Sequence, residues 1–358
     1  AFALGTRLVQ SGHAVRLYGA PRFEPACAAR GIELTPCRSV PPFPRDVDLT
    51  TVSREFLRPA LNGAEVAKEI VGAAEESGAG ALVVDCVMGA AFTAAQYLGL
   101  PTAVLVHVLF QPFAAWGKTI VDVGPSRAAL GLSRLEVGHM STLLEPTAVR
   151  LVTTLPELDV PGPTPAGTRY VGPVLEPGAD EDWDSPFDPS DDRPLVLVSL
   201  STTFQNQMDA LGTILDALAG LPVRALLTLG GILTPESVAA PDNVAVAGFV
   251  PHAAVLPQAA IVVSHAGLST IMTSLAYGVP LVCIPQGRDQ GINAERVEAV
   301  GAGVCLAKEA DAEAIARAIV RTLGARGYRD AAAGFESSIT GLGRGARAAA
   351  EVEALLGA

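Results

Sequence analysis

The stretch 261–302 places polar side chains directly after two predicted strands. It reads IVVSHAGLSTIMTSLAYGVPLVCIPQGRDQGINAERVEAVGA. The β-branched run at 261–264 predicts a strand buried on both faces of a parallel sheet, and a helix is expected to begin near Gly267. A helix that begins beside the carboxyl end of such a strand presents free N–H groups to an anion. His265 lies between the two elements, so its imidazole and these amides are candidates to bind a phosphate.

The next turn brings a carboxylate and an amide to the same edge of the predicted sheet. The run 281–284 predicts a second strand, and Asp289 and Gln290 follow the turn at 285–287. Both side chains are suited to hydrogen bonds with hydroxyl groups. An anion site beside hydroxyl-binding groups favours a nucleotide diphosphate that carries a sugar. The alternative for both residues is capping of the helix predicted over 293–300.

This pattern resembles the donor-binding signature of a known enzyme family, the inverting, metal-independent glycosyltransferases of the UDP-glycosyltransferase superfamily. The residues that carry the resemblance are His265, Gly267, Ser269, Thr270, Gly278, Val279, Pro280, Pro285, Asp289, Gln290, Asn293 and Ala294. The resemblance covers nearly the whole chain and points in particular to actinobacterial enzymes that glycosylate macrolides and other polyketide antibiotics. It implies an α/β fold of the GT-B type, in which two Rossmann-like domains face a cleft.

The resemblance also implies roles for residues of the donor site. The expected phosphate-binding residues are His265, Gly267, Ser269 and Thr270, with Ser201 and Thr202 after another predicted strand. Phe249 and Val250 are expected at the nucleotide base, where the family often has a stacking tryptophan, so this departure leaves the base preference open. Asp289 and Gln290 are expected to bind the sugar. The donor is then a TDP- or UDP-sugar as co-substrate, with no cofactor and no metal.

Asp85 ends the strand predicted over 80–85. In the family that the chain resembles, an aspartate at this place pairs with a general-base histidine in the loop after the first strand. The chain begins inside a predicted helix, so we expect that strand and its histidine to precede Ala1. Asp85 is therefore a candidate catalytic residue. The alternative is a cap for the helix predicted over 88–98.

Several residues after the next predicted strand are candidates for an acceptor pocket. His107 ends the strand predicted over 102–107 and lies at the same edge as Asp85. Instead of lining an acceptor pocket, it could act as a substitute general base or be a structural histidine. Phe110, Phe113 and Trp116 follow within a short span. They either wall an apolar acceptor cavity or belong to the core.

We expect the elements that position these residues to belong to two domains, because a chain of 358 residues exceeds the usual size of a single core. We expect an acceptor domain at 1–178, an acidic Pro/Gly-rich linker at 179–193 and a donor domain at 194–340. By the resemblance, a final helix at 341–358 crosses back to the first domain.

Composition excludes several other classes of protein. The net charge of -12, with no dense cluster of Lys and Arg, argues against a nucleic-acid partner. Apolar runs end before about 18 residues, which argues against a membrane span. Five cysteines without CxxC pairing indicate reduced thiols and a cytoplasmic protein.

The sequence therefore predicts transfer of a sugar, with inversion, from a TDP- or UDP-sugar to a hydroxyl of a small hydrophobic natural product. A homodimer is compatible with this prediction. Two alternatives stay open: a nucleotide-sugar 2-epimerase of the same fold, and a non-catalytic glycosyltransferase-like helper protein.

Overall fold

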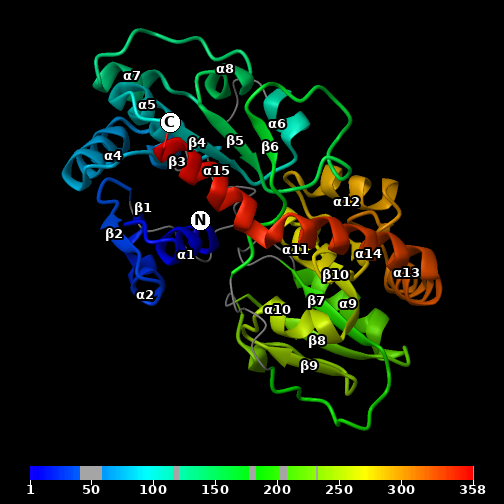
Figure 1. Cartoon of the computed structure of the whole chain (residues 1–358). Coiled ribbons are helices and arrows are strands. Elements are labelled where there is room, and N and C mark those ends of the chain that lie inside the picture. Colours follow the sequence, from blue (N-terminus) through cyan, green and yellow to red (C-terminus); the bar gives the residue numbers. More distant parts are fainter. Residues whose placement is uncertain (41–58, 116–120, 177–182, 201–207, 231–232, 358) are drawn as a thin grey trace. The chain divides into compact units, whose positions relative to one another are not determined.

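The computed structural model is built from parallel strands and helices, which alternate along much of the chain (Figure 1). It describes residues 1–40, 59–115, 121–176, 183–200, 208–230 and 233–357. The chain forms two compact units. Unit 1 contains Ala1–Phe43, Val52–Pro177 and Leu342–Ala358, and unit 2 contains Gly178–Gly341.

Unit 1 contains two parallel sheets. The smaller pairs β1 with β2, and the larger has the order β3-β4-β5-β6. The strands are β1 (Arg16–Gly19), β2 (Glu33–Pro36), β3 (Leu82–Asp85), β4 (Thr102–Val106), β5 (Val149–Val152) and β6 (Thr168–Tyr170). The pairing of β3 with β4 sets Asp85 opposite Leu105, so the residues that follow both strands emerge at one edge.

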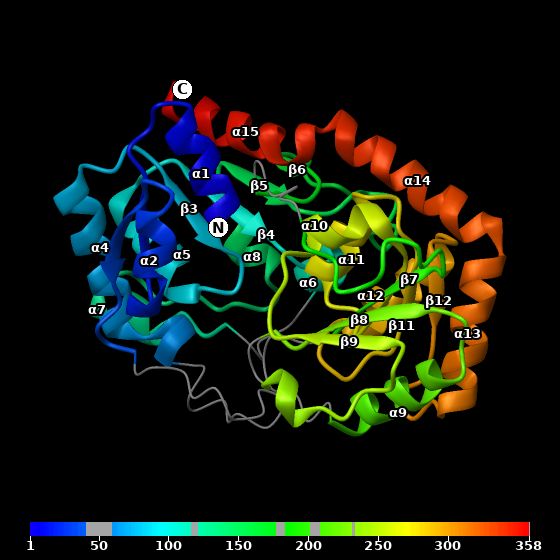
Figure 2. The same cartoon turned by 90° about the horizontal axis from the view of Figure 1, so that it is seen from below.

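The helices of unit 1 cover its sheets with apolar side chains. They are α1 (Phe2–Gln10), η1 (Pro21–Phe23), α2 (Glu24–Ala28), α4 (Ala64–Ser77), α5 (Gly89–Leu98), α6 (Phe110–Ala115), α7 (Gly124–Ala129), α8 (Ser141–Leu144), η4 (Gly343–Gly345) and α15 (Ala346–Leu356). One core forms where α4, α5 and α7 pack together with side chains of β3 and β4. A second forms where α15 lies beside α1 and packs on β4 and β5, as Figure 2 shows.

Unit 2 is built on one six-stranded parallel sheet of order β12-β11-β10-β7-β8-β9. Its strands are β7 (Leu195–Ser199), β8 (Arg224–Thr228), β9 (Val244–Ala247), β10 (Ala259–Ser264), β11 (Leu281–Cys283) and β12 (Gly303–Cys305). β7 and β10 are central and are buried almost along their whole length, as expected for apolar β-branched runs covered on both faces.

The helices of unit 2 flank this sheet. They are α9 (Met208–Ala219), η2 (Pro235–Ser237), α10 (His252–Val255), η3 (Leu256–Gln258), α11 (Leu268–Leu275), α12 (Gln290–Ala299), α13 (Ala312–Gly324) and α14 (Arg326–Gly341). Side chains of α9 and α13 form one core with Val198, Leu227 and Val263 of the central strands. No helix in the described part of the chain combines the length and apolarity that crossing a bilayer requires.

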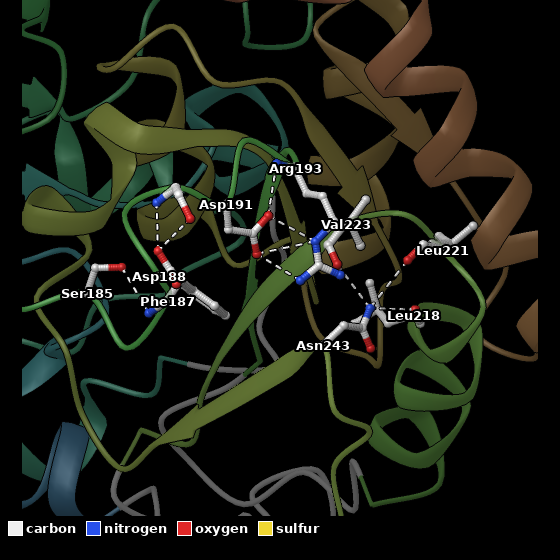
Figure 3. A network of polar contacts seen from close by, with 10 residues as sticks. Ser185, Phe187, Asp188, Asp191, Arg193, Leu218, Leu221, Val223 and Asn243 are labelled. Carbon is white, nitrogen blue, oxygen red and sulfur yellow. Dashed lines mark hydrogen bonds and ion pairs between the residues drawn. The ribbon is translucent and has the colours of Figure 1, made fainter.

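Polar contacts order the segment that leads into β7 and the turn between α9 and β8, both in unit 2 (Figure 3). Arg193 makes two hydrogen bonds to the Asp191 carboxylate with its Nε, at 3.0 and 3.2 Å, and a third with its terminal nitrogen, at 2.8 Å. Beside it, Asn243 Nδ2 donates to the carbonyls of Leu218, Leu221 and Val223 at 2.9, 3.5 and 3.1 Å. The three Asn243 bonds close the turn between α9 and β8.

Candidate functional site

The turn after β10 brings a histidine against a glycine at the start of α11. Gly267 is the N-cap of α11, and a Cβ added there would lie 2.7 Å from Nε2 of His265. Ala266, between them, has φ 63°, a left-handed conformation that costs a residue with a side chain about 1–3 kcal/mol. The imidazole thus lies against the helix start because residue 267 has no side chain.

His265 is held as a neutral imidazole. Its side chain is buried, with the residue 8% exposed, and Nδ1 makes no hydrogen bond within the described ranges. Burial is the largest influence and lowers the pKa of His265 below 6.5, and the Arg288 charge acts in the same direction. The backbone of Ser199 and the charge of Asp289 oppose this shift only in part.

The N-terminus of α11 provides amide groups next to this imidazole. No side chain caps the helix, and its first turn contains no acidic residue. Ser269 and Thr270 lie in this first turn, as predicted from the sequence, with Ser269 exposed and Thr270 partly buried. Free N–H groups and the helix dipole therefore favour an anion here. The other predicted phosphate ligands, Ser201 and Thr202, lie outside the described residues.

Asp289 and Gln290 lie at the start of α12, three residues earlier than the helix predicted over 293–300. Asp289 is the N-cap, but its side chain does not cap the helix. Instead, its Oδ2 accepts a hydrogen bond from Asn293 Nδ2 at 3.0 Å. Asn293 Nδ2 also donates to the carbonyl of Ala266 at 3.2 Å, so it ties the turn after β10 to the start of α12. Sequence reasoning noted Asn293 only as part of the signature.

The Gln290 side chain stabilises the turn that precedes α12. It is buried, and Oε1 accepts hydrogen bonds from the amides of Gln286 and Gly287 at 2.7 and 3.1 Å. The carboxamide therefore closes the turn after β11. Arg288 in this turn has φ 57°, a second left-handed residue beside the candidate site. A sugar-binding role for Asp289 and Gln290 stays a prediction.

A cavity lies beside the residues predicted to bind the nucleotide base. Its volume is about 360 Å³, and its lining includes Trp183, Asp184, Leu226 and Val250. Phe249 is 73% exposed and is not part of the lining, whereas Val250 is. Sequence reasoning missed Trp183 because it assigned this residue to the linker. An aromatic side chain is therefore present near Val250, although it comes from another part of unit 2.

In unit 1, Asp85 and His107 form an ion pair after β3 and β4. Nε2 of His107 lies 3.0 Å from Oδ2 and 3.1 Å from Oδ1 of Asp85, and the side chains are 46% and 43% exposed. The Asp85 carboxylate also accepts a hydrogen bond from the Val87 amide at 3.0 Å. Helix α5 has Met88 as its N-cap without a side-chain bond, so Asp85 closes the turn rather than capping this helix.

The pair is ionised around neutral pH. Burial alone would lower the pKa of His107, but contacts with Asp85 and Cys86 outweigh it and raise this pKa to about 11. Burial likewise would raise the pKa of Asp85, but the His107 contact and the Val87 amide hold it below its usual value. An imidazolium has no lone pair to accept a proton, which argues against His107 as a substitute base.

The aromatic candidates for the acceptor pocket lie in the core or outside the described ranges. Phe110 and Phe113 are buried in the core of unit 1, which favours the core alternative, and Trp116 is outside the described residues. Sequence reasoning missed the buried Asp159, which accepts hydrogen bonds from the Phe110 amide at 2.7 Å and the Tyr170 hydroxyl at 2.9 Å. Asp159 thus holds the start of α6, just after His107.

Sequence comparison finds glycosyltransferases among the relatives. Residues 212–351 match the family model "Erythromycin biosynthesis protein CIII-like, C-terminal domain". A PGL/p-HBAD biosynthesis glycosyltransferase of Mycobacterium tuberculosis (H37Ra) is 33% identical over 190 residues, covering 51% of this chain and 42% of the relative. The uncharacterized UDP-glucosyltransferase YojK of Bacillus subtilis is 31% identical over 187 residues, covering 51% and 46%. The matches span less than half the length of these relatives.

Solved structures resemble nearly the whole chain. The glycotransferase of kitacinnamycin superposes with a TM-score of 0.78 at 22% identity, covering 99% of this chain and 94% of that one. The spinosyn rhamnosyltransferase SpnG complexed with thymidine diphosphate has a TM-score of 0.64 at 21% identity, covering 95% and 92%. These likenesses confirm the predicted α/β fold of the GT-B type with two Rossmann-like domains. The resemblance to glycosyltransferases of natural-product biosynthesis is confirmed by the sequence comparisons.

Proposed function

From this resemblance and the geometry of the turns after β10 and β11, we propose that the protein is a glycosyltransferase. It moves a sugar from a TDP- or UDP-sugar to a hydroxyl of a small hydrophobic natural product. The observation that carries the proposal is the neutral, buried His265 beside the uncapped N-terminus of α11. The same turn is tied by Asn293 to Asp289, which places a carboxylate next to the anion site.

The donor phosphates would be bound without a metal. A neutral imidazole can donate one N–H, and the first amides of α11 supply further donors. Each hydrogen bond to a charged oxygen contributes about 1.5–3 kcal/mol, and it strengthens as the diphosphate gains charge on leaving. Support for a nucleoside diphosphate comes from SpnG, whose structure was solved with thymidine diphosphate.

In the proposed reaction the acceptor oxygen attacks the anomeric carbon opposite the diphosphate. The C–O bond to the acceptor forms while the bond to the diphosphate breaks, so the configuration inverts. The acceptor proton passes to a general base, and Asp85 stabilises the protonated base through its carboxylate. A positioned base contributes about 10² to 10⁴ in rate. Asp289 and Gln290 hold sugar hydroxyls.

The test is mass spectrometry of reactions with UDP- and TDP-sugars and a panel of hydroxylated aromatic and macrolide acceptors, with a chelator present. We expect an acceptor mass increased by one sugar residue, and product amounts that depend on the acceptor. An isomerised nucleotide-sugar formed without any acceptor would contradict the proposal and indicate an epimerase. Donor binding without turnover on any acceptor would point to a helper protein.

A further inference from the structure

Three side chains with metal-binding atoms meet at the carboxyl ends of β3 and β4. Asp85 is the last residue of β3, Cys86 follows it, and His107 follows β4. A carboxylate oxygen, the thiol sulfur and a ring nitrogen all lie within 4.8 Å of one another. This is the one group of three His, Cys, Asp or Glu residues with such proximity in the described ranges. The pairing of two adjacent parallel strands creates it.

The burial of the three groups suits an ion that enters from one side. Cys86 is fully buried, whereas the side chains of Asp85 and His107 are about half exposed. The sulfur therefore forms the floor of the cluster, and the carboxylate and imidazole form its accessible rim. An ion held by all three would keep a further coordination position for water on the open side.

The combination of ligands selects for a particular type of metal. A thiolate, an imidazole and a carboxylate suit Zn²⁺, whereas Mg²⁺ and Ca²⁺ prefer oxygen ligands alone. Tetrahedral Zn²⁺ with bonds of about 2.0–2.3 Å places its ligand atoms roughly 3.2–3.8 Å apart. Nε2 of His107 already lies 3.0 Å from Oδ2 and 3.1 Å from Oδ1 of Asp85, and the Cys86 sulfur lies within 4.8 Å of both groups. Side-chain rotations would bring the three ligand atoms around an ion.

We propose that Asp85, Cys86 and His107 form a zinc-binding site. The Cys86 thiol and the His107 imidazolium each lose a proton to solvent as their bonds to the metal form, and no electron is transferred. Bound zinc coordinates the Asp85 carboxylate, which then cannot stabilise a protonated base. If the proposed glycosyl transfer depends on that carboxylate, zinc at this site inhibits transfer, a consequence that rests on the proposed function.

Binding is tested on the whole chain with Zn²⁺ alone, by calorimetry, and with Co²⁺ as a spectroscopic substitute. We expect one ion per chain and a thiolate-to-cobalt charge-transfer band. Cys86→Ala should abolish the band and weaken zinc binding by about tenfold or more. Cys27→Ala is the matched control, because Cys27 is also buried in unit 1 but belongs to no such group in the part of the chain that the structure describes. It should bind zinc like the wild type.

His107→Asn provides a second variant, at a side chain that is half exposed, and circular dichroism checks its fold. It should still fold, with a lower melting temperature because its pair with Asp85 is lost, and it should lose zinc affinity by a similar factor. Wild-type binding unchanged in Cys86→Ala and His107→Asn would overturn the proposal, as would the absence of binding at millimolar Zn²⁺.

Inhibition is measured separately from binding. Zinc should inhibit sugar transfer by the wild type, and Cys86→Ala should transfer normally in a chelator and resist inhibition when zinc is added. Equal inhibition of both proteins would overturn the inhibitory role. A chain that binds zinc through Cys86 but transfers no sugar would refute the proposed function and leave the zinc site standing.

Discussion

His265 in unit 2 and His107 in unit 1 both follow a parallel strand, yet they are in opposite charge states. His265 is 8% exposed, has no carboxylate in hydrogen-bond contact within the described residues, and has a lowered pKa. His107 is half exposed and lies 3.0 Å from a carboxylate, and its pKa is raised to about 11. The same residue type at equivalent topological positions is therefore a neutral donor in one unit and a cation in the other. Burial dominates at His265 and lowers its pKa, whereas at His107 the contacts with Asp85 and Cys86 outweigh burial and raise its pKa.

The largest expected effect is that of removing the neutral histidine. His265→Ala should lower kcat/KM for sugar transfer by about 100-fold to 1000-fold, because a donor to the leaving diphosphate is lost. Steady-state kinetics measures the loss, and circular dichroism checks that the fold is retained. Near-normal turnover by a folded variant would refute the phosphate role of His265.

Asp85→Asn tests the charged pair of unit 1. We expect kcat to fall by about 100-fold with little change in donor affinity, since a carboxylate that stabilises a protonated base contributes mainly in the transition state. The pKa of His107 should fall from about 11 toward its ordinary value, which NMR titration of the imidazole measures. An unchanged kcat would restrict Asp85 to closing the turn at Val87.

Gly267→Ala should have a smaller effect on the same site as His265. The added methyl group would lie 2.7 Å from Nε2 of His265, so the imidazole must move away from the start of α11. We expect KM for the donor to rise about tenfold, of the order of one lost hydrogen bond. Gly212→Ala in α9 is the control, because outside its own helix no described residue has a heavy atom within 4 Å of the added Cβ. If both variants bind donor like the wild type, His265 does not depend on its contact with Gly267.

The smallest effects are expected in the pH dependence of stability, and they have opposite signs. The lowered pKa of His265 means that its burial destabilises the fold as pH falls below the unfolded value of about 6.5. The raised pKa of His107 means that its pair with Asp85 stabilises fully below about 6.5 and is lost as pH rises toward about 11.

Denaturant unfolding from pH 5 to 9, in a chelator, compares the wild type with His265→Gln and His107→Gln. The wild type should lose more stability on acidification than His265→Gln, and more on alkalinisation than His107→Gln. Parallel curves for all three proteins would show that neither histidine changes its pKa on folding.

Local patterns predicted much of the fold and part of the site. The strand predicted over 261–264 corresponds to β10, Ala259–Ser264, and that over 281–284 to β11, Leu281–Cys283. Apolar β-branched runs encode strands locally, and Gly267 marks the start of α11 as expected. The α/β class followed from the alternation of such elements.

The structural roles of several side chains could not be predicted in this way. The Gln290 side chain accepts a hydrogen bond from the Gln286 amide and so closes the turn after β11. Trp183, which was assigned to the linker, lines a cavity together with Val250. Asp159 holds α6 through the Phe110 amide, 49 residues away along the chain. Each contact depends on which segments the fold places side by side, and no local spacing records it.

By itself, the sequence determined the order of strands and helices, because hydrophobic periodicity and turn residues act over a few positions. It also placed Asp85 and His265 at strand ends and Asp289 after the turn that follows a strand. Only the tertiary structure decided the charge states of the histidines. The pairing of β3 with β4 brought His107 to Asp85 and Cys86, whereas packing around β10 removed water from His265. A pKa responds to neighbours within a few ångströms, and in a folded chain these neighbours come from distant parts of the sequence.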